Sequence, residues 1–381
     1  MVNIVKFLFV CGGSAGHINP ALAIAEELRK KIYDAEILFV GADKTLEKRL
    51  IPKAGFQLTN INMSGLSRGF SPSDIAHNIK TALNLFTASF KADKLLKEFN
   101  PDVIIGTGGY ICYPVIKRAT KKGIPAYILE PNACPGLTVK MLDKAVDGIF
   151  VTYKGIERRF SRPEKVVYTG TPLSSEFNKH VNEKEERQSN EKPLVVSYWG
   201  SVGATEMNNK IINFIARNSQ EQKFNHIHAT GIGDSMKRMK EKLEGLGIKE
   251  VNAPLIDIRE YIDNMPEVLI RADLALTRAG ASTIAELKAT GTPAILVPSP
   301  NVTENHQEEN ALKMQNTGGA VMITENDCNG DVLFDMVTAI LNNKSKLQEM
   351  ARSQKSQSVQ DSASRIIDIV TGRLSDSIKG V

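Results

Sequence analysis

Residues 6–30 read KFLFVCGGSAGHINPALAIAEELRK, and this stretch decides the fold class. The apolar run Lys6–Val10 has the length of a buried strand, and it gives way to small residues at 12–16. A helical pattern follows, with Asn19 as a candidate N-cap and Pro20 as a residue suited to a first helical turn. We therefore expect a strand, a glycine turn and a helix that begins at Asn19 and Pro20.

The same pattern restarts in the second half of the chain, where residues 193–218 read PLVVSYWGSVGATEMNNKIINFIARN. The preceding segment NKHVNEKEERQSNEKP has no hydrophobic periodicity, so we expect a solvated loop near a domain boundary. A chain of 381 residues is also too long for one ordinary core. We predict two Rossmann-like, doubly wound α/β domains that face one another across a cleft. The first spans 1–168 and the second 169–356, and a C-terminal helix at about 357–376 packs back on the first.

Short apolar runs alternate with amphipathic stretches through both halves, which is typical of parallel sheets covered by helices. Beyond the run that opens the second half, the expected strands are Val5–Val10, Ile37–Val40, Gln57–Ile61, Val103–Ile105, Ala126–Leu129, Gly148–Thr152, Ile227–Thr230, Leu274–Thr277, Ala294–Val297 and Ala320–Ile323.

The composition, with 42% hydrophobic and 24% charged residues, is that of a soluble globular protein. No apolar run reaches the ~20 residues of a membrane-spanning helix, and we expect residues 1–13 to form a buried strand rather than a signal peptide. The four cysteines are scattered without metal-type or redox-type spacing, which favours reduced thiols. The net charge of +5 permits an anionic partner, but no zinc finger, basic ribbon or basic tail is present, so we expect no nucleic-acid binding.

The first glycine turn has the features of a phosphate-binding loop. Gly12, Gly13 and Gly16 let the backbone approach a phosphate, and the start of the helix supplies a positive dipole end. The spacing is not that of a dinucleotide-binding fingerprint. His17 stands beside the turn and adds a titratable group, although a tight turn with an incidental histidine is the alternative.

Two further strand ends carry candidate residues. Gly108 and Gly109 follow one buried strand, and a second glycine turn on the same sheet indicates a shared anion site. Glu130 and Asn132 follow the next strand, where a carboxylate is suited to catalysis or orientation of a ligand. A loop residue that caps the following helix is the alternative for Glu130.

In the second half, the turn at residues 278–282 reads RAGAS, and the helix after it carries Glu286. Small residues at a helix start let backbone N–H groups contact a diphosphate, and this carboxylate could accept both hydroxyls of a ribose. An exposed helix charge is the alternative for Glu286. His306, Gln307 and Asn310 are polar groups at helical spacing that suit a sugar.

Taken together, the motifs resemble those of the MurG family, the N-acetylglucosaminyltransferases that complete the lipid-linked disaccharide precursor of bacterial peptidoglycan. They occur in the family's order along nearly the whole chain, as GGSAGHINPALA, GGYICYP, LEPNACPGLTVK, TRAGASTIAE and HQEENA. The departures from the family pattern are Ala15, Leu129, Pro131, Ser174, Trp199 and Val202, which stand where Gly, His, Gln, Arg, Gly and Gln are usual.

The resemblance implies a glycosyltransferase-B fold and inverting transfer of N-acetylglucosamine from UDP-N-acetylglucosamine to a polyprenyl-diphosphate-linked muramyl pentapeptide. It implies that the UDP-sugar contacts Ser201, Arg278, Ala281, Ser282, Glu286, His306, Gln307 and Asn310. It implies that the acceptor diphosphate contacts Gly12, Gly13, Ser14, Gly16, Gly108, Gly109 and Tyr110.

For the chemistry, His17 is the expected general base, because an imidazole titrates near neutral pH. Glu130 is the second candidate base, or it orients the acceptor together with Asn132. No D-x-D-like pair sits at a suitable strand end, so we expect no bound metal and no tightly bound cofactor.

A lipid acceptor requires contact with a membrane surface. Ile75, Ile79, Leu83, Phe86 and Phe90 recur at helical spacing, and several lysines surround them. This pattern fits docking to an anionic membrane, and a core-facing stripe is the alternative. We expect a peripheral protein on the cytoplasmic face of the cell membrane, in contact with other proteins of cell-wall synthesis.

Three other functions remain open from the sequence: a related glycolipid transferase, a UDP-sugar epimerase of the same architecture, and a non-catalytic nucleotide-sugar binder. An epimerase would change the UDP-sugar with no acceptor present, so product analysis separates it from a transferase. Choice of acceptor separates the two kinds of transferase.

Overall fold

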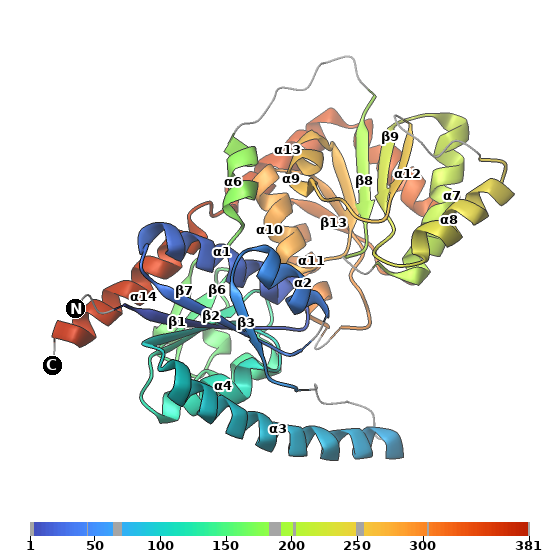
Figure 1. The fold of residues 1–381 in the computed structure, drawn as a ribbon. Coiled ribbons are helices and arrows are strands. Elements are labelled where there is room, and N and C mark those ends of the chain that lie inside the picture. Colours follow the sequence, from blue (N-terminus) through green and yellow to red (C-terminus); the bar gives the residue numbers. More distant parts are fainter. Residues whose placement is uncertain are drawn as a thin grey trace. The chain divides into compact units, whose positions relative to one another are not determined.

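The structure of the chain, a computed structural model, describes residues 4–43, 45–63, 71–182, 192–200, 203–248, 255–302 and 305–379. The chain divides into two compact units, Met1–Ser175 with Val359–Val381, and Glu176–Ser358. Each unit is a parallel sheet with helices on both faces (Figure 1). The predicted fold class, two doubly wound α/β units, is confirmed.

In the first unit, seven parallel strands lie in the order β3-β2-β1-β4-β5-β6-β7. The strand order reverses direction between β1 and β4, which is the switch point where ligands bind in such sheets. The loops that follow β1 and β4 therefore open side by side. The strands are β1 (Lys6–Cys11), β2 (Glu36–Gly41), β3 (Gln57–Asn60), β4 (Val103–Gly108), β5 (Ala126–Glu130), β6 (Gly148–Val151) and β7 (Val166–Tyr168).

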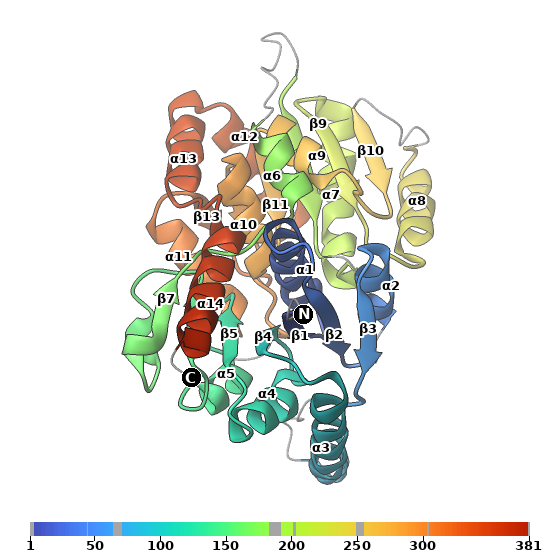
Figure 2. The same ribbon diagram turned by 60° about the vertical axis from the view of Figure 1, so that its left-hand side comes forward.

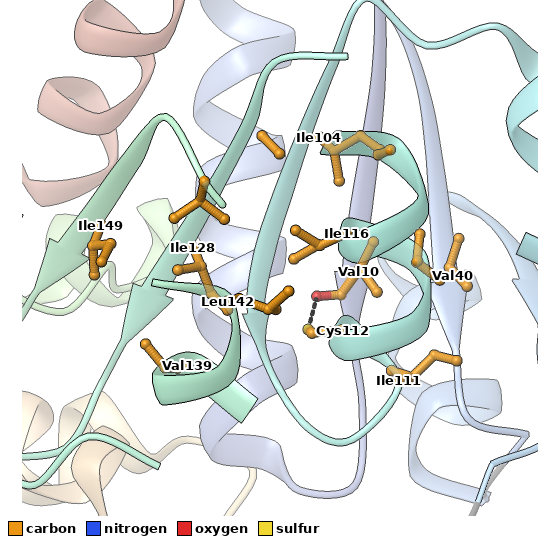
Figure 3. Packing of buried hydrophobic residues seen from close by; sticks show 14 of the residues in the cluster. Val10, Val40, Ile104, Ile111, Cys112, Ile116, Ile128, Val139, Leu142 and Ile149 are labelled. Carbon is orange, nitrogen blue, oxygen red and sulfur yellow. Dashed lines mark hydrogen bonds between the residues drawn. The ribbon is translucent and has the colours of Figure 1, made fainter. Parts of the chain in front are cut away.

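Helices cover both faces of this sheet, which explains why β1 and β4 are apolar along nearly their whole length. One face packs against α3 (Pro72–Phe99), α4 (Cys112–Lys121) and α5 (Leu137–Leu142). Figure 3 shows this layer, in which aliphatic side chains of the strands and of α4 and α5 pack together and the thiol of Cys112 donates to the carbonyl of Val10. The opposite face packs against α1 (Ala15–Lys31), α2 (Thr45–Lys53) and α14 (Ser362–Lys379). Two 3-10 turns, η1 (Glu157–Arg159) and η2 (Pro163–Lys165), precede β7.

The C-terminal helix α14 belongs to the first unit. It lies against α1, where Lys31 Nζ is 2.5 Å from Asp368 Oδ1 (Figure 2). The hydroxyl of Ser362 donates to the carbonyl of Gly170 at 2.9 Å, which ties the start of the helix to the end of the first sheet. Ile366 and Val370, on the inner face of α14, are fully buried. The helix therefore completes the core of a sheet that lies about 200 residues earlier in the chain.

The prediction that the first helix begins at Asn19 and Pro20 is wrong. The helix α1 begins at Ala15, after Ser14 in an extended conformation. The carbonyl of Ser14 accepts from His17 N and Ile18 N, both at 3.1 Å, so the first turn forms ahead of the proline. Pro20 lacks an N–H and removes one helical hydrogen bond, but the turns on either side hold the helix. As a result, His17 lies within the first turn of α1.

In the second unit, six parallel strands lie in the order β10-β9-β8-β11-β12-β13, with the switch point between β8 and β11. The strands are β8 (Leu194–Tyr198), β9 (Asn225–Ala229), β10 (Ile256–Arg259), β11 (Leu274–Thr277), β12 (Ala294–Leu296) and β13 (Ala320–Met322). The helices are α6 (Ser175–Asn182), α7 (Thr205–Glu221), α8 (Ser235–Gly245), α9 (Met265–Arg271), α10 (Ala281–Thr290), α11 (His306–Asn316), α12 (Gly330–Leu341) and α13 (Lys344–Ser356).

Two of the predictions from the sequence are corrected by the structure. The strands β7 and β10, of three and four residues, were not predicted. The expected loop at 178–193 is helical in its first part, since α6 extends to Asn182, and residues 183–191 lie outside the described structure. In the described part of the chain, no helix is both long enough and apolar enough to cross a membrane.

Candidate active site

The two glycine loops of the first unit touch at the switch point. A Cβ atom at Gly109 would lie 2.3 Å from the carbonyl oxygen of Gly12, and Gly109 has a φ of +91°. A Cβ at Gly108 would lie 2.4 Å from Cδ2 of His17. Only glycine at both positions lets the β4–α4 loop lie against the β1–α1 loop and the His17 ring. The predicted proximity of the two loops is therefore observed.

His17 has a defined orientation. Its Nδ1 lies 2.9 Å from the carbonyl oxygen of Gly12, and since a carbonyl only accepts, Nδ1 is the protonated nitrogen. In the neutral imidazole the lone pair is then on Nε2. Ser14 Oγ lies 3.3 Å from the same Nδ1. The hydroxyl of Thr107, at the end of β4, donates to the carbonyl of His17 at 2.6 Å and ties the first turn of α1 to the second loop.

A buried carboxylate that the sequence analysis missed lies behind the first loop. Glu47, on α2, is fully buried, and its Oε1 accepts from the backbone N–H of Gly13 at 2.8 Å. Its Oε2 is buried with no hydrogen-bond partner among the described residues. The Gly13 N–H is therefore taken by a carboxylate, and the prediction that Gly13 contacts a phosphate would have to use other atoms of this residue. In the sequence, Glu47 is one charge among several on a short helix, and nothing marks it as buried.

The two thiols at this edge of the sheet are neutral. Burial raises the pKa of Cys112 to about 12, and burial also raises the pKa of Cys11 well above its usual value. Both cysteines act as small apolar residues, and the sulfur of Cys112 donates to the carbonyls of Val10 and Gly108. Tyr110, in the same loop, is partly exposed.

Glu130 and Asn132 are in contact, and the hydrogen bonds of the Glu130 carboxylate hold its own loop in place. Glu130 Oε1 accepts from the backbone N–H and the side-chain amide of Asn132 at 2.9 and 3.1 Å. Glu130 Oε2 accepts from the N–H of Gly136 at 2.7 Å, immediately before α5. Three N–H donors thus engage one buried carboxylate, which matches the helix-capping alternative. A role in catalysis stays a prediction.

In the second unit, Arg278 is buried at the end of β11. Its Nη2 lies 2.5 Å from Glu325 Oε2, and its Nη1 donates to the carbonyls of Val297 and Pro298 at 3.1 and 3.2 Å. Glu325 follows β13 and was also missed, because its partner is distant in sequence. The guanidinium therefore joins the ends of β11, β12 and β13, and direct contact with a diphosphate stays a prediction.

The start of α10 carries a buried hydroxyl that lacks a hydrogen bond. Ser282 Oγ has no partner among the described residues. Gly280 is the N-cap in an extended conformation, so the first N–H groups of α10 need partners from outside the helix. Unsatisfied buried donors at a helix start are suited to an anionic ligand. Ala281 is buried in the same turn.

Glu286 lies in the second turn of α10 and is half-buried. Removal from water raises the pKa of its carboxyl to about 7, because the charged form is disfavoured. The predicted alternative of an exposed helix charge is wrong.

The polar residues of α11 have different roles. Asn310 is fully buried, and its amide donates to the carbonyl of Ala279 at 3.1 Å, which holds the β11–α10 turn. Gln307 Oε1 accepts from the N–H of Ser299 at 2.9 Å. His306 is the first residue of α11 and is half-buried. Ser201 lies outside the described residues.

In the described part of the chain, no group of three or more His, Cys, Asp or Glu side chains is placed to hold a metal ion. The groups available for an anionic ligand are the helix starts, the glycine loops and the hydroxyls described above.

Comparison with protein families identifies the two units. Residues 7–151 match the N-terminal domain of glycosyltransferase family 28, and residues 194–366 match the C-terminal domain of the same family. The chain belongs to the MurG family within glycosyltransferase family 28. A relative from Acetivibrio thermocellus is 38% identical over 99% of this chain and 100% of its own length. A relative from Caldanaerobacter subterraneus is 39% identical over 96% of this chain and 99% of its own length.

Both relatives are named UDP-N-acetylglucosamine–N-acetylmuramyl-(pentapeptide) pyrophosphoryl-undecaprenol N-acetylglucosamine transferase. Among solved structures, MurG from Acinetobacter baumannii superimposes with a TM-score of 0.72 at 22% identity, over 96% of this chain and 99% of that one. A UDP-GlcNAc 2-epimerase from Neisseria meningitidis superimposes with a TM-score of 0.64 at 13% identity, over 97% of this chain and 100% of that one. At these identities the likeness shows the glycosyltransferase-B fold alone.

Proposed function

We infer that this family 28 glycosyltransferase transfers N-acetylglucosamine from UDP-N-acetylglucosamine to the muramyl sugar of a pentapeptide carried on undecaprenyl diphosphate. The observation that carries this inference is the 38% identity to a transferase of that name over 99% of this chain and all of the relative. Three of the motifs that carried the resemblance lie at switch points: GGSAGHINPALA follows β1, GGYICYP follows β4 and TRAGASTIAE follows β11.

The transfer is an inverting displacement, in which a hydroxyl of the acceptor sugar attacks the anomeric carbon of the donor. The new C–O bond forms as the bond to UDP breaks, UDP leaves with the electron pair, and the hydroxyl proton goes to a base. His17 is that base, and its orientation supports this role, since Nδ1 donates to Gly12 and the lone pair is on Nε2. Glu130 is a weaker candidate because three N–H donors already occupy its oxygens.

The donor diphosphate contacts the start of α10 and the hydroxyl of Ser282. The N–H groups of that helix start and the partnerless Ser282 Oγ support this assignment. These groups stabilise the charge that develops on the departing diphosphate, so the transfer requires no tightly bound metal or cofactor. Glu286 accepts the ribose hydroxyls, and His306 contacts the sugar. Arg278, Gln307 and Asn310 hold the loops around the donor in place.

The protein works peripherally at the cytoplasmic face of the membrane. Two aromatic side chains on α3 support this assignment, since Phe86 is 80% exposed and Phe90 is 72% exposed. They lie on the side of α3 opposite the buried residues Ala88 and Ala92, and exposed lysines follow them along the helix. The side chains of Ile75, Ile79 and Leu83 lie outside the described residues. An exposed aromatic pair beside lysines is suited to an anionic lipid surface.

The test is transfer of labelled N-acetylglucosamine from its UDP donor to the lipid-linked muramyl pentapeptide. We expect product with this donor and acceptor, a far slower reaction with UDP-glucose or UDP-galactose, and no glycolipid when diacylglycerol is the acceptor. A parallel reaction without acceptor detects epimerisation of the donor. Donor epimerisation without transfer, or transfer to diacylglycerol alone, would show that the proposed function is wrong.

A further inference from the structure

One peptide group in the first glycine loop is engaged by side chains at both ends. The N–H of Gly13 donates to Glu47 Oε1 at 2.8 Å. The carbonyl oxygen of Gly12 accepts from His17 Nδ1 at 2.9 Å. That N–H and that carbonyl belong to the same peptide unit, so a buried carboxylate and an imidazole are joined through a single peptide bond.

This arrangement requires close packing, which the loop residues provide. A Cβ at Gly12 would lie 2.8 Å from Glu47 Oε1, so glycine is needed for the carboxylate to approach. Gly13 has a φ of +90°, a conformation that turns its N–H toward α2. Glu47 is fully buried, and its second oxygen has no hydrogen-bond partner among the described residues. Its charge therefore acts on the peptide without screening by water.

We propose that Glu47 is a positioning residue for His17, acting through the Gly12–Gly13 peptide. Hydrogen bonds in a chain polarise one another, so the carboxylate makes the Gly12 carbonyl a stronger acceptor for Nδ1–H. That keeps Nδ1 protonated, leaves the lone pair on Nε2 and stabilises the imidazolium once it has formed. A carboxylate that bonds directly to a catalytic histidine acts in the same way, and here a peptide group stands between the two. No proton crosses the peptide: the acceptor proton goes to Nε2, and Nδ1 keeps its own.

The other titratable groups at this edge of the sheet do not replace Glu47. The thiols of Cys11 and Cys112 are neutral, since burial raises the pKa of both. The carboxylate of Glu130 is engaged by three N–H donors of its own loop. Tyr110 is partly exposed, and Ser14 Oγ is a more distant partner of Nδ1 at 3.3 Å.

The test uses Glu47→Gln in the full-length enzyme, because glutamine keeps an acceptor for Gly13 N–H and removes only the charge. The His17 pKa is measured by NMR without substrate, and a His17→Asn variant assigns the signal among the six histidines. We expect the His17 pKa to fall by about one unit, as for a unit charge several ångströms away in a partly buried site. We also expect kcat to fall about tenfold with KM for the UDP-sugar unchanged. Glu47→Asp, which keeps the charge, should restore the pKa and part of the rate.

Glu36→Gln is the matched control, because Glu36 is an exposed carboxylate of the same unit that pairs with Lys6, and it should change neither quantity. An unchanged His17 pKa in Glu47→Gln would overturn the proposal. The ¹⁵N shifts of His17 in the unaltered enzyme give a second test that needs no variant, since a tautomer protonated on Nε2 would also overturn it. The proposal rests on the proposed function only for its effect on rate. A lowered pKa with an undiminished kcat would support the coupling and refute His17 as the base.

Discussion

The histidines of the two units show how the same side chain serves different purposes. In the first unit, His17 lies in the first turn of α1 beside the switch point, half-buried, with Nδ1 donating to a backbone carbonyl. In the second unit, His226 and His228 lie within β9 and are fully buried. Ser197 Oγ lies 2.7 Å from His226 Nε2 and 2.7 Å from His228 Nδ1. Burial lowers the pKa of both well below that of a free imidazole, to about 3 for His228.

The difference teaches that burial within a strand lowers the pKa of a histidine, so His226 and His228 stay neutral at neutral pH. His226 packs edge-on against Phe214, with ring centroids 5.0 Å apart, as an aromatic core residue would. The contacts of both rings with Ser197 link β9 to β8. A backbone carbonyl accepts from Nδ1 of His17 and orients its ring. In the proposed function, the first unit provides the general base and the second provides the groups that bind the donor.

The largest expected effect is that of His17→Ala. Loss of the general base should lower kcat about a thousandfold. Calorimetric affinity for UDP should not change, because the UDP-binding groups are assigned to the second unit. A variant with normal kcat would remove His17 from the mechanism. His228→Ala, in contrast, should act on stability and leave kcat per folded molecule intact.

Acid pH should test the buried pair. The folded-state pKa values lie below the unfolded value of about 6.5, so the unfolded chain binds more protons as pH falls, and stability is lost below pH 6.5. Between pH 7 and 5.5 the second unit should lose about 1 kcal/mol for each histidine. Trp199, the sole tryptophan and part of the second core, reports urea unfolding of this unit by fluorescence. His226→Leu should lose about half of the acid effect, and an equal loss in variant and parent would contradict this account.

Glu286 is a partly buried carboxyl with a raised pKa, and it lies at the proposed ribose site. Glu286→Ala should weaken binding of UDP-N-acetylglucosamine about thirtyfold, as for lost hydrogen bonds to a charged group. Burial raises its pKa to about 7, and only the carboxylate accepts both ribose hydroxyls, so affinity should fall as pH drops through 7. Calorimetry at pH 6 and 8 measures both effects. Glu241→Ala, on the exposed surface of α8, is the control, and a Kd in Glu286→Ala equal to that of the parent would exclude the ribose role.

The smallest expected effect concerns the surface of the first unit. The Phe86→Ser, Phe90→Ser double variant should bind anionic vesicles about tenfold more weakly in a flotation assay, because two exposed aromatic rings no longer enter the lipid. Transfer to a short-chain, water-soluble acceptor should be unchanged. Tyr33→Ser is the control, because Tyr33 is 91% exposed on the same unit but outside α3. Equal flotation of the double variant and the parent would place the membrane contact elsewhere.

Much of the fold follows from sequence pattern alone. The runs around Lys6–Cys11 and Leu194–Tyr198 are continuously apolar because both faces of each sheet are covered, and a glycine turn after each strand marks the restart. The glycine loops, His17 and the α10 turn were found because phosphate loops and helix starts have local signatures. The short strands β7 and β10 lack such a signature. The start of α1 was misplaced because the first turn forms ahead of Pro20, with the Ser14 carbonyl accepting from the N–H groups of His17 and Ile18.

The tertiary structure alone decided what the charged residues contact. Glu47 and Glu325 look like ordinary surface charges in the sequence, and only packing brings one against Gly13 and the other against Arg278. The glycine turn singled out His17 in the sequence, but the hydrogen-bond partner of its ring came only from the structure. The physical reason is that backbone preferences and hydrophobic periodicity are local, whereas burial and hydrogen-bond partners depend on segments far apart in the chain. The sequence by itself determined the class of fold and its loops, and the three-dimensional contacts determined which nitrogen of His17 holds the proton.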